Sequence, residues 1–217
     1  MNDDDNVSAR TSPIDDWTRA LSRSVGAPGG GAATGVMLAI AASLASMVAG
    51  YTETTADSAT ELTALRRRTE ALRVTALQLA DADAVASRRF GAAFAREPGP
   101  DRDAAIRDAS LDAARSSAAL GTQAVAAVDD LEWLKQHSAT ALVADLAVAL
   151  SAVRGALTGA RANLSFDLGS LTGVWQSLDD VRASYPGLWT AVHDFDRAVA
   201  RVDRIGEEID DRAAPTD

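Results

Sequence analysis

The stretch APGGGAATGVMLAIAASLASMVAGYT, residues 27–52, decides the fold. Its three consecutive glycines, Gly29, Gly30 and Gly31, lead directly into the uncharged segment Ala32–Thr52. Glycine lets the backbone approach a neighbouring group closely, and a helix start offers N–H groups that have no intrahelical partner. A helix that is apolar on every side belongs at the centre of a protein. The stretch predicts a buried central helix that begins at a glycine loop suited to an anionic or oxygen-rich ligand, with a plain turn as the alternative.

The composition favours a helical core and excludes several classes of protein. Of the 217 residues, 47% are hydrophobic and only 5% are aromatic, so Ala, Leu and Val must form most of the core. Small side chains suit close helix packing, whereas sheets favour β-branched and aromatic residues. The net charge of -10 argues against binding to nucleic acid or to an anionic membrane surface. The chain has no cysteine for thiolate chemistry and only two histidines, so no metal site is expected.

The N-terminal residues and the apolar segment bear on localisation. Residues 1–10 are expected to form a disordered acidic tail, and residues 11–217 to form a single helical domain. The chain starts with acidic residues, whereas a secretory signal starts with basic ones. Ala32–Thr52 is long enough to cross a membrane, but it is rich in small residues and lacks flanking basic anchors. We expect a cytoplasmic protein with no membrane partner.

The remainder of the chain reads as helices, because apolar residues recur at alternating intervals of three and four. The expected helices cover about residues 12–25, 57–95, 103–135, 138–164, 171–184 and 188–210, with a loose stretch at 165–170. The fold class is therefore all-α: a helical bundle of about five long helices followed by C-terminal helices. The basic run Arg66–Arg68 is expected to form a solvated face.

Asp83 is the most informative single residue. It lies on the apolar stripe of the helix predicted over residues 57–95, between Leu79 and Ala86 on that face. A buried carboxylate is costly unless it is paired or protonated. Such groups commonly have shifted pKa values and act as acids or bases. A structural ion pair with an arginine of a neighbouring helix is equally compatible with the pattern.

Asp145 and His137 are two further candidates for proton transfer. Asp145 interrupts an apolar run, and the spacing of four places it on the same helical face as Ala141 and His137. Asp145 is interpreted either as a relocated catalytic carboxylate or as a structural residue that bonds a neighbouring helix. His137 is interpreted either as a proton shuttle near neutral pH or as an exposed residue at a helix start.

Arg154 and Arg161 are seven residues apart, which places both on one face of a helix. Their guanidinium groups are interpreted either as a clamp for a ligand carboxylate or as partners of the buried aspartates. Gly155 and Gly159 on the same helix indicate close approach of another helix.

Three separated blocks of sequence follow one another along the chain. They are the glycine loop followed by ASMVA at residues 45–49, DADA at residues 81–84, and VRGAL with RANL at residues 153–164. In content, order and spacing these blocks resemble the cyclodeaminase/cyclohydrolase family of folate enzymes. The resemblance covers roughly residues 14–164 and fades beyond them.

The resemblance implies folate one-carbon chemistry. Members of the family cyclise 5-formiminotetrahydrofolate with loss of ammonia, or hydrolyse the methenyl bridge of tetrahydrofolate. Both reactions pass through a tetrahedral carbon between two nitrogens and need proton transfers that carboxylates can provide. The resemblance further implies Asp81 and Asp83 as an acidic pair, a tetrahydrofolate derivative as substrate, no tightly bound cofactor, and an intimate homodimer.

Two departures from the family pattern leave other functions open. The aspartate of the family's S-D-A-G block corresponds to Ala141, and the family's lysines after Thr52 are replaced by the stretch 53–56, which has no basic residue. The alternatives are a divergent enzyme that opens or closes a C–N ring of a non-folate small molecule in specialised metabolism, and a non-catalytic helical dimer that binds a ligand. The retained glycine loop and Asp83 favour an enzyme.

Overall fold

The computed structural model describes residues 7–24, 26–53, 55–56, 58–174 and 177–213, and regular structure in these residues is entirely helical. This confirms the all-α prediction. The elements are α1 (Ile14–Leu21), α2 (Gly30–Tyr51), α3 (Ala59–Phe94), α4 (Pro100–His137), the 3₁₀ helix η2 (Thr140–Leu142), α5 (Val143–Val174), α6 (Leu178–Ser184) and α7 (Pro186–Ala213).

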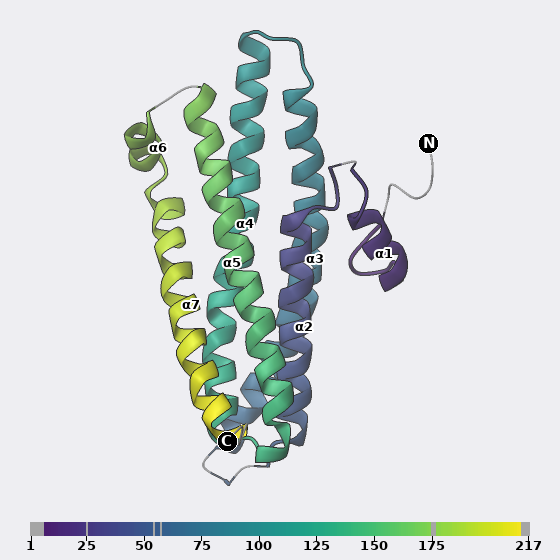
Figure 1. The fold of residues 1–217 in the computed structure, drawn as a ribbon, viewed down its shortest axis with the longest axis vertical. Coiled ribbons are helices and arrows are strands. Elements are labelled where there is room, and N and C mark those ends of the chain that lie inside the picture. Colours follow the sequence, from purple (N-terminus) through teal and green to yellow (C-terminus); the bar gives the residue numbers. More distant parts are fainter. Residues whose placement is uncertain (1–6, 25, 54, 57, 175–176, 214–217) are drawn as a thin grey trace.

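The long helices α2, α3, α4, α5 and α7 run side by side as an elongated bundle (Figure 1). Helix α2 packs against α3 and α5, α4 packs against α3 and α5, and α7 covers α4 and α5. The short α1 lies beside α2 and α3, and α6 lies near the start of α7 (Figure 1). The main core follows the shared interior of the five long helices.

Helix α2 is at the centre because its small residues allow neighbouring backbones to come close. A Cβ atom added at Gly35 would lie 2.8 Å from the Ala80 Cβ of α3. On the opposite side, a Cβ at Gly155 of α5 would lie 2.9 Å from the Met37 sulfur, and a Cβ at Gly159 would overlap the Thr34 hydroxyl. These contacts confirm that the two α5 glycines serve helix packing, and they fix α2 and α5 in antiparallel alignment.

The central helices meet a length and composition criterion for membrane spans, as the sequence suggested for one of them. Two helical segments, Gly30–Tyr51 and Thr140–Thr172, are long and apolar enough to cross a membrane, with mean hydropathies of 1.9 and 1.6. In the first segment 56% of the most apolar window is buried inside the bundle. A core helix has this composition because it is surrounded by protein, so the criterion alone is weak support for a membrane segment.

The structure corrects the predicted C-terminal elements. Helix α5 continues to Val174, through the stretch 165–170 that the sequence analysis assigned to a loose segment. Ser170 lies within the helix, where its hydroxyl donates to the Phe166 carbonyl at 3.1 Å. The apolar residues Leu164, Leu168 and Leu171 form one buried stripe that extends the helix. Helix α1 is also shorter than predicted, with eight residues.

The arginine run at residues 66–68 is exposed, as expected, and two of its members also make structural contacts. The Arg66 guanidinium donates two hydrogen bonds to the Ala49 carbonyl, at 2.9 and 2.7 Å, and so caps the C-terminal end of α2. Arg68 pairs with the buried Asp130 of α4 at 2.6 Å and with Glu61 at 2.6 Å. These contacts tie α3 to its neighbours.

Gly121 of α4 provides a stability prediction for the packing of α7. A Cβ atom at Gly121 would overlap the ring of Phe195, which is 1% exposed. Gly121→Ala is therefore expected to lower the free energy of unfolding by about 2 kcal/mol, the usual cost of overpacking. Gly206→Ala on α7, where a Cβ meets nothing within 4 Å, serves as the control and is expected to be neutral or stabilising. Equal effects in urea unfolding would contradict this packing.

Candidate functional site

A pocket of about 310 Å³ lies where α2 begins, between α3, α4 and α5. It contains both the glycine loop and Asp83, two features that the sequence analysis selected separately. Its lining residues are Gly26, Gly29, Gly30, Gly31, Asp83, Ser87, Phe90, Gly91, Ala113, Ser117, Asn163, Phe166 and Asp167.

The start of α2 is directed at the carboxyl group of Asp83. The backbone N–H of Ala32 donates a hydrogen bond to this carboxyl group, and the Ser87 hydroxyl approaches it at 3.4 Å. A Cβ atom at Gly31 would overlap the Asp83 carboxyl group, so only glycine permits this approach. The free N–H groups at a helix start favour a bound anion. Here the group that they bind is the Asp83 carboxyl group of the protein itself.

Among the described residues, Asp83 has no cationic partner although it is buried. Its exposed fraction is 5%, and burial raises its pKa, while the hydrogen bonds from Ser87 and Ala32 oppose that rise. The ion pairs of the described residues do not include Asp83, so the structural-pair interpretation lacks its arginine. A carboxyl group of this kind exchanges its proton closer to neutral pH than an ordinary aspartate.

Asp167 is a second buried acid in the same pocket, 7% exposed, on α5. Burial, together with the charge of Asp83, raises the pKa of Asp167 to about 7, while the Ser117 hydroxyl at 3.4 Å opposes the rise. Because two carboxylates in one pocket repel each other, the pair holds a proton at neutral pH. One aspartate can then accept a proton while the other donates one.

Asp167 makes stability depend on pH. Its native pKa of about 7 exceeds the value of about 3.9 for an unfolded aspartate, so between these values the native chain binds more protons. The free energy of unfolding therefore falls as pH rises through this interval. Asp167→Asn removes this pH dependence because asparagine does not titrate. The free energy of unfolding of the variant, relative to that of the wild type, is therefore expected to rise by about 2.5 kcal/mol between about pH 5 and pH 8. Urea unfolding at both pH values measures this, and a pH-independent difference would contradict it.

Asp81, the other member of the predicted acidic pair, lies outside the pocket lining. Its carboxylate accepts a hydrogen bond from the Ser8 hydroxyl at 2.7 Å and another from the Ala9 backbone N–H at 2.6 Å. Asp81 therefore fastens the N-terminal segment to α3. The predicted disordered tail included Ser8 and Ala9, whereas these two residues are held in place; residues 1–6, on which the rest of that prediction falls, lie outside the described residues.

Asp145 and His137 lie far from the pocket. Asp145 is in the first turn of α5, and its separation of 22 positions from Asp167 corresponds to roughly 33 Å of helix. A carboxylate in a first turn is stabilised by the helix dipole, which gives Asp145 a structural reason for its position. His137 is exposed at the end of α4, where its ring stacks on Trp133 at 4.0 Å.

Arg154 and Arg161 point to α7 rather than to the pocket. Arg154 pairs with Asp203, its Nε lying 2.5 Å from Oδ1, and Arg161 pairs with Asp196. All four side chains are between 42% and 49% exposed, so each pair contributes little to stability. Neither arginine belongs to the pocket lining, and neither pairs with a buried aspartate.

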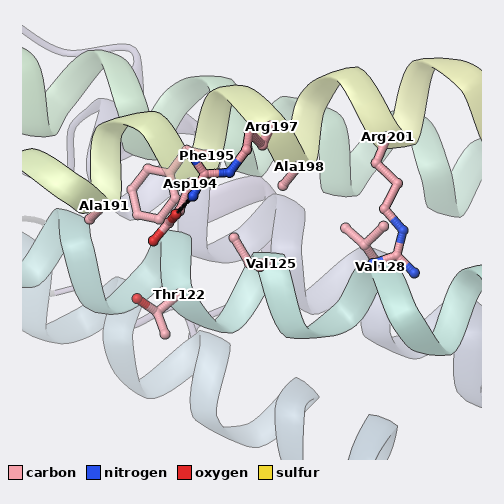
Figure 2. A pocket seen from close by; sticks show the side chains of 9 residues that line it. All are labelled: Thr122, Val125, Val128, Ala191, Asp194, Phe195, Arg197, Ala198 and Arg201. Atoms are coloured by element: carbon pink, nitrogen blue, oxygen red, sulfur yellow. Dashed lines mark hydrogen bonds and ion pairs between the residues drawn. The ribbon is translucent and has the colours of Figure 1, made fainter.

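A second groove, of about 280 Å³, lies between α4 and α7 (Figure 2). Val125 and Val128 face Phe195 and Ala198 across it, and these contacts hold α7 on the bundle. Its charged groups are already paired, Asp194 with Arg197 and Arg201 with acids of α4. Within the described residues, no group of three or more His, Asp or Glu side chains could hold a metal ion. The pocket at the glycine loop is therefore the stronger candidate.

Asp167 and Asn163 are two polar pocket residues that sequence reasoning did not select as candidates. Asn163 lies opposite Gly30, since a Cβ there would be 3.7 Å from the Asn163 Oδ1. Both residues project from α5 four positions apart, on one helical face. The available signal for Asp167 was its position between the apolar residues Leu164 and Leu168, the same signal that identified Asp83.

Comparisons with known proteins agree with this architecture. The profile of the formiminotransferase-cyclodeaminase family matches residues 13–174. The fold is similar to a crystal structure of formiminotetrahydrofolate cyclodeaminase from Thermotoga maritima, with a TM-score of 0.77, 18% sequence identity, and coverage of 95% of this chain and 98% of that chain. A comparison with curated proteins gives no significant match. Because the family profile spans most of the sequence, including the glycine loop, Asp83 and Asp167, the chain belongs to the formiminotransferase-cyclodeaminase family.

Proposed function

We propose that the chain is an enzyme that closes or opens the C–N ring of a folate one-carbon derivative, formimino- or methenyl-tetrahydrofolate, by carboxylate acid–base catalysis. One observation carries the proposal: two buried carboxyl groups, Asp83 and Asp167, share a pocket at the glycine start of α2. The names of the matching family and of the similar crystal structure support the choice of reaction.

In the cyclising direction, the formimino group enters in its protonated, amidinium form, and a ring-closing N–H nitrogen of the substrate attacks its carbon. The resulting tetrahedral centre carries the two ring nitrogens and an amino group. Asp83 accepts the proton that the attacking nitrogen loses. Asp167 donates its proton to the departing amino group, which leaves as ammonia as the C–N bond breaks. The hydrogen bonds from Ala32 and Ser87 favour the ionised form of Asp83, and the charge of Asp83 favours the protonated form of Asp167, so each group starts in the form required.

The direct experiment supplies the purified chain with 5-formiminotetrahydrofolate and with methenyltetrahydrofolate in separate reactions. Ammonia release and a rising methenyl absorbance indicate cyclodeaminase activity, and a falling methenyl absorbance indicates hydrolysis. Neither change above the uncatalysed rate, with a folded protein, would overturn the proposal. In that case, ligand-induced stabilisation by 5-formyltetrahydrofolate, about 2.7 kcal/mol at a hundredfold excess over Kd, would identify a non-catalytic binder.

The second candidate is the same chemistry on a non-folate small molecule. The pairing of two arginines favours this candidate. Arg154 and Arg161 were candidates for binding the carboxylates of a folate tail, but both pair with aspartates of α7. The basic residues that the family carries after Thr52 are also absent from the stretch 53–56. Turnover of a tail-free cyclic amidine, with no turnover of either folate, would select this candidate. Both candidates need only a small-molecule substrate and no bound cofactor, and the proposed compartment is the cytoplasm.

A homodimer is part of the proposal. Three large apolar side chains of α2, Ile40, Met47 and Tyr51, are 47%, 38% and 70% exposed. Their spacing of seven and four places them on one face of the helix. Such a face is typical of surfaces that associate, and a symmetric dimer would cover it on both chains. Light scattering is expected to give twice the mass of one chain, and a monomer at micromolar concentration would contradict this part.

A further inference from the structure

Three of the four phenylalanines of the chain form one cluster, and two of them line the acidic pocket. The Phe90 ring lies 4.7 Å from that of Phe94 and 6.2 Å from that of Phe166, measured between centroids. Phe90 and Phe166 line the pocket, and Phe166 is 66% exposed although it is a large apolar side chain. Aromatic side chains that line a pocket provide apolar surface against which a planar ligand can pack.

The charge inside the pocket has one sign. The ionisable lining residues among those the structure describes are Asp83 and Asp167, and both are more than nine-tenths buried. The lining contains no lysine, arginine or histidine within that described set. An anionic ligand group entering this space would meet two acids and no compensating cation, whereas a cationic group would relieve their repulsion.

The volume limits what can enter. At about 310 Å³ the pocket is at the small end of ligand sites, which span roughly 300–1,000 Å³. It accommodates one ring system and leaves a long substituent outside. The features together describe a small, planar and positively charged ligand portion.

We propose that this pocket selects its ligand by charge: an aromatic ring lies against Phe90 and Phe166, an attached amidinium group faces Asp83 and Asp167, and anionic groups are excluded. The inference rests on the proposed function, because it assigns the ligand class of the same pocket. An amidinium is planar and has several N–H donors, so it can bond to both carboxyl groups while it shares the ring plane.

Three probes that differ only in charge test this selectivity on the purified chain at about pH 8. They are benzamidine, a cation, benzamide, its neutral analogue, and benzoate, an anion, with Kd measured by calorimetry. We expect benzamidine to bind at least about tenfold more tightly than benzamide, with no detectable benzoate binding. Equal affinity for benzamidine and benzamide, or measurable benzoate affinity of similar strength, would overturn the inference.

Variants separate the two recognition elements. Asp167→Asn is expected to bring the benzamidine and benzamide affinities within about threefold of each other, and Phe166→Ala to weaken both by about tenfold. Leu178→Ala, which removes an exposed apolar side chain of α6, is the matched control and should change neither. Turnover of a folate substrate combined with equal probe affinities overturns this inference alone. Selective benzamidine binding without turnover of any C–N ring substrate overturns the proposed function alone.

Discussion

Asp83→Asn is expected to reduce turnover by about 10² to 10⁴-fold while the protein remains folded. The asparagine amide occupies the same volume as the aspartate carboxyl group, but it cannot accept the proton that the attacking nitrogen loses. The fold should tolerate the change because it removes a buried charge. Asp83 is 5% exposed and has no cationic partner in the described residues. Steady-state ammonia release, with circular dichroism as the folding check, measures the effect.

Asp81→Asn is the matched control, two residues away on the same helix. Asp81 bonds Ser8 and Ala9 rather than the pocket, so its loss is expected to lower stability by about 1 kcal/mol and to leave turnover within about threefold of the wild type. If Asp83→Asn retained full activity, or if both variants lost activity equally, Asp83 would not be the base.

Gly31→Ala is expected to lower turnover by about 10²-fold, because its methyl group takes the space of the Asp83 carboxyl group. The displaced carboxyl group would lose the hydrogen bond from the Ala32 N–H, and overpacking at the start of α2 should cost about 1–3 kcal/mol. Turnover and urea unfolding of the variant measure the two effects.

Gly30→Ala provides the comparison one residue earlier. A Cβ at Gly30 makes only an ordinary contact, 3.7 Å from the Asn163 Oδ1, so activity and stability should stay near the wild-type values. Similar losses in both variants would mean that the glycines serve the turn alone. The larger Gly30→Val is expected to weaken ligand binding, since its branched side chain reaches into the pocket.

The bundle could be predicted from the sequence because the periodic apolar residues of each long helix indicate which of its faces is buried. The apolar stripe that contains Asp83 predicted its burial, and the small residues of α2 predicted a central helix. The glycine loop and Asp83 were both selected, but their meeting depends on how α2 and α3 align, which the helical period alone does not specify. That alignment is fixed by Gly35, which brings α2 against Ala80.

The rest of the site could not be predicted because helical periodicity reports the face of a residue and not its height in the bundle. Asp145 and Asp167 lie on the same helix, and both interrupt apolar residues, yet roughly 33 Å of α5 separates them. Asp167 was missed because Gly169 and the serines around it are typical of a loop, whereas packing against α4 and α7 keeps this stretch helical. The ion-pair partners of Arg154 and Arg161 could not be predicted for a related reason: they lie on α7, outside the blocks that resemble the family.

The pH profile of ammonia release from 5-formiminotetrahydrofolate tests the acid–base pair most directly. In the wild type, kcat/KM is expected to fall as pH rises through about 7, because Asp167 loses the proton that it donates. In Asp167→Asn the rate should be low at every pH and should lack this inflection. An unchanged inflection at wild-type rates in Asp167→Asn would contradict the account.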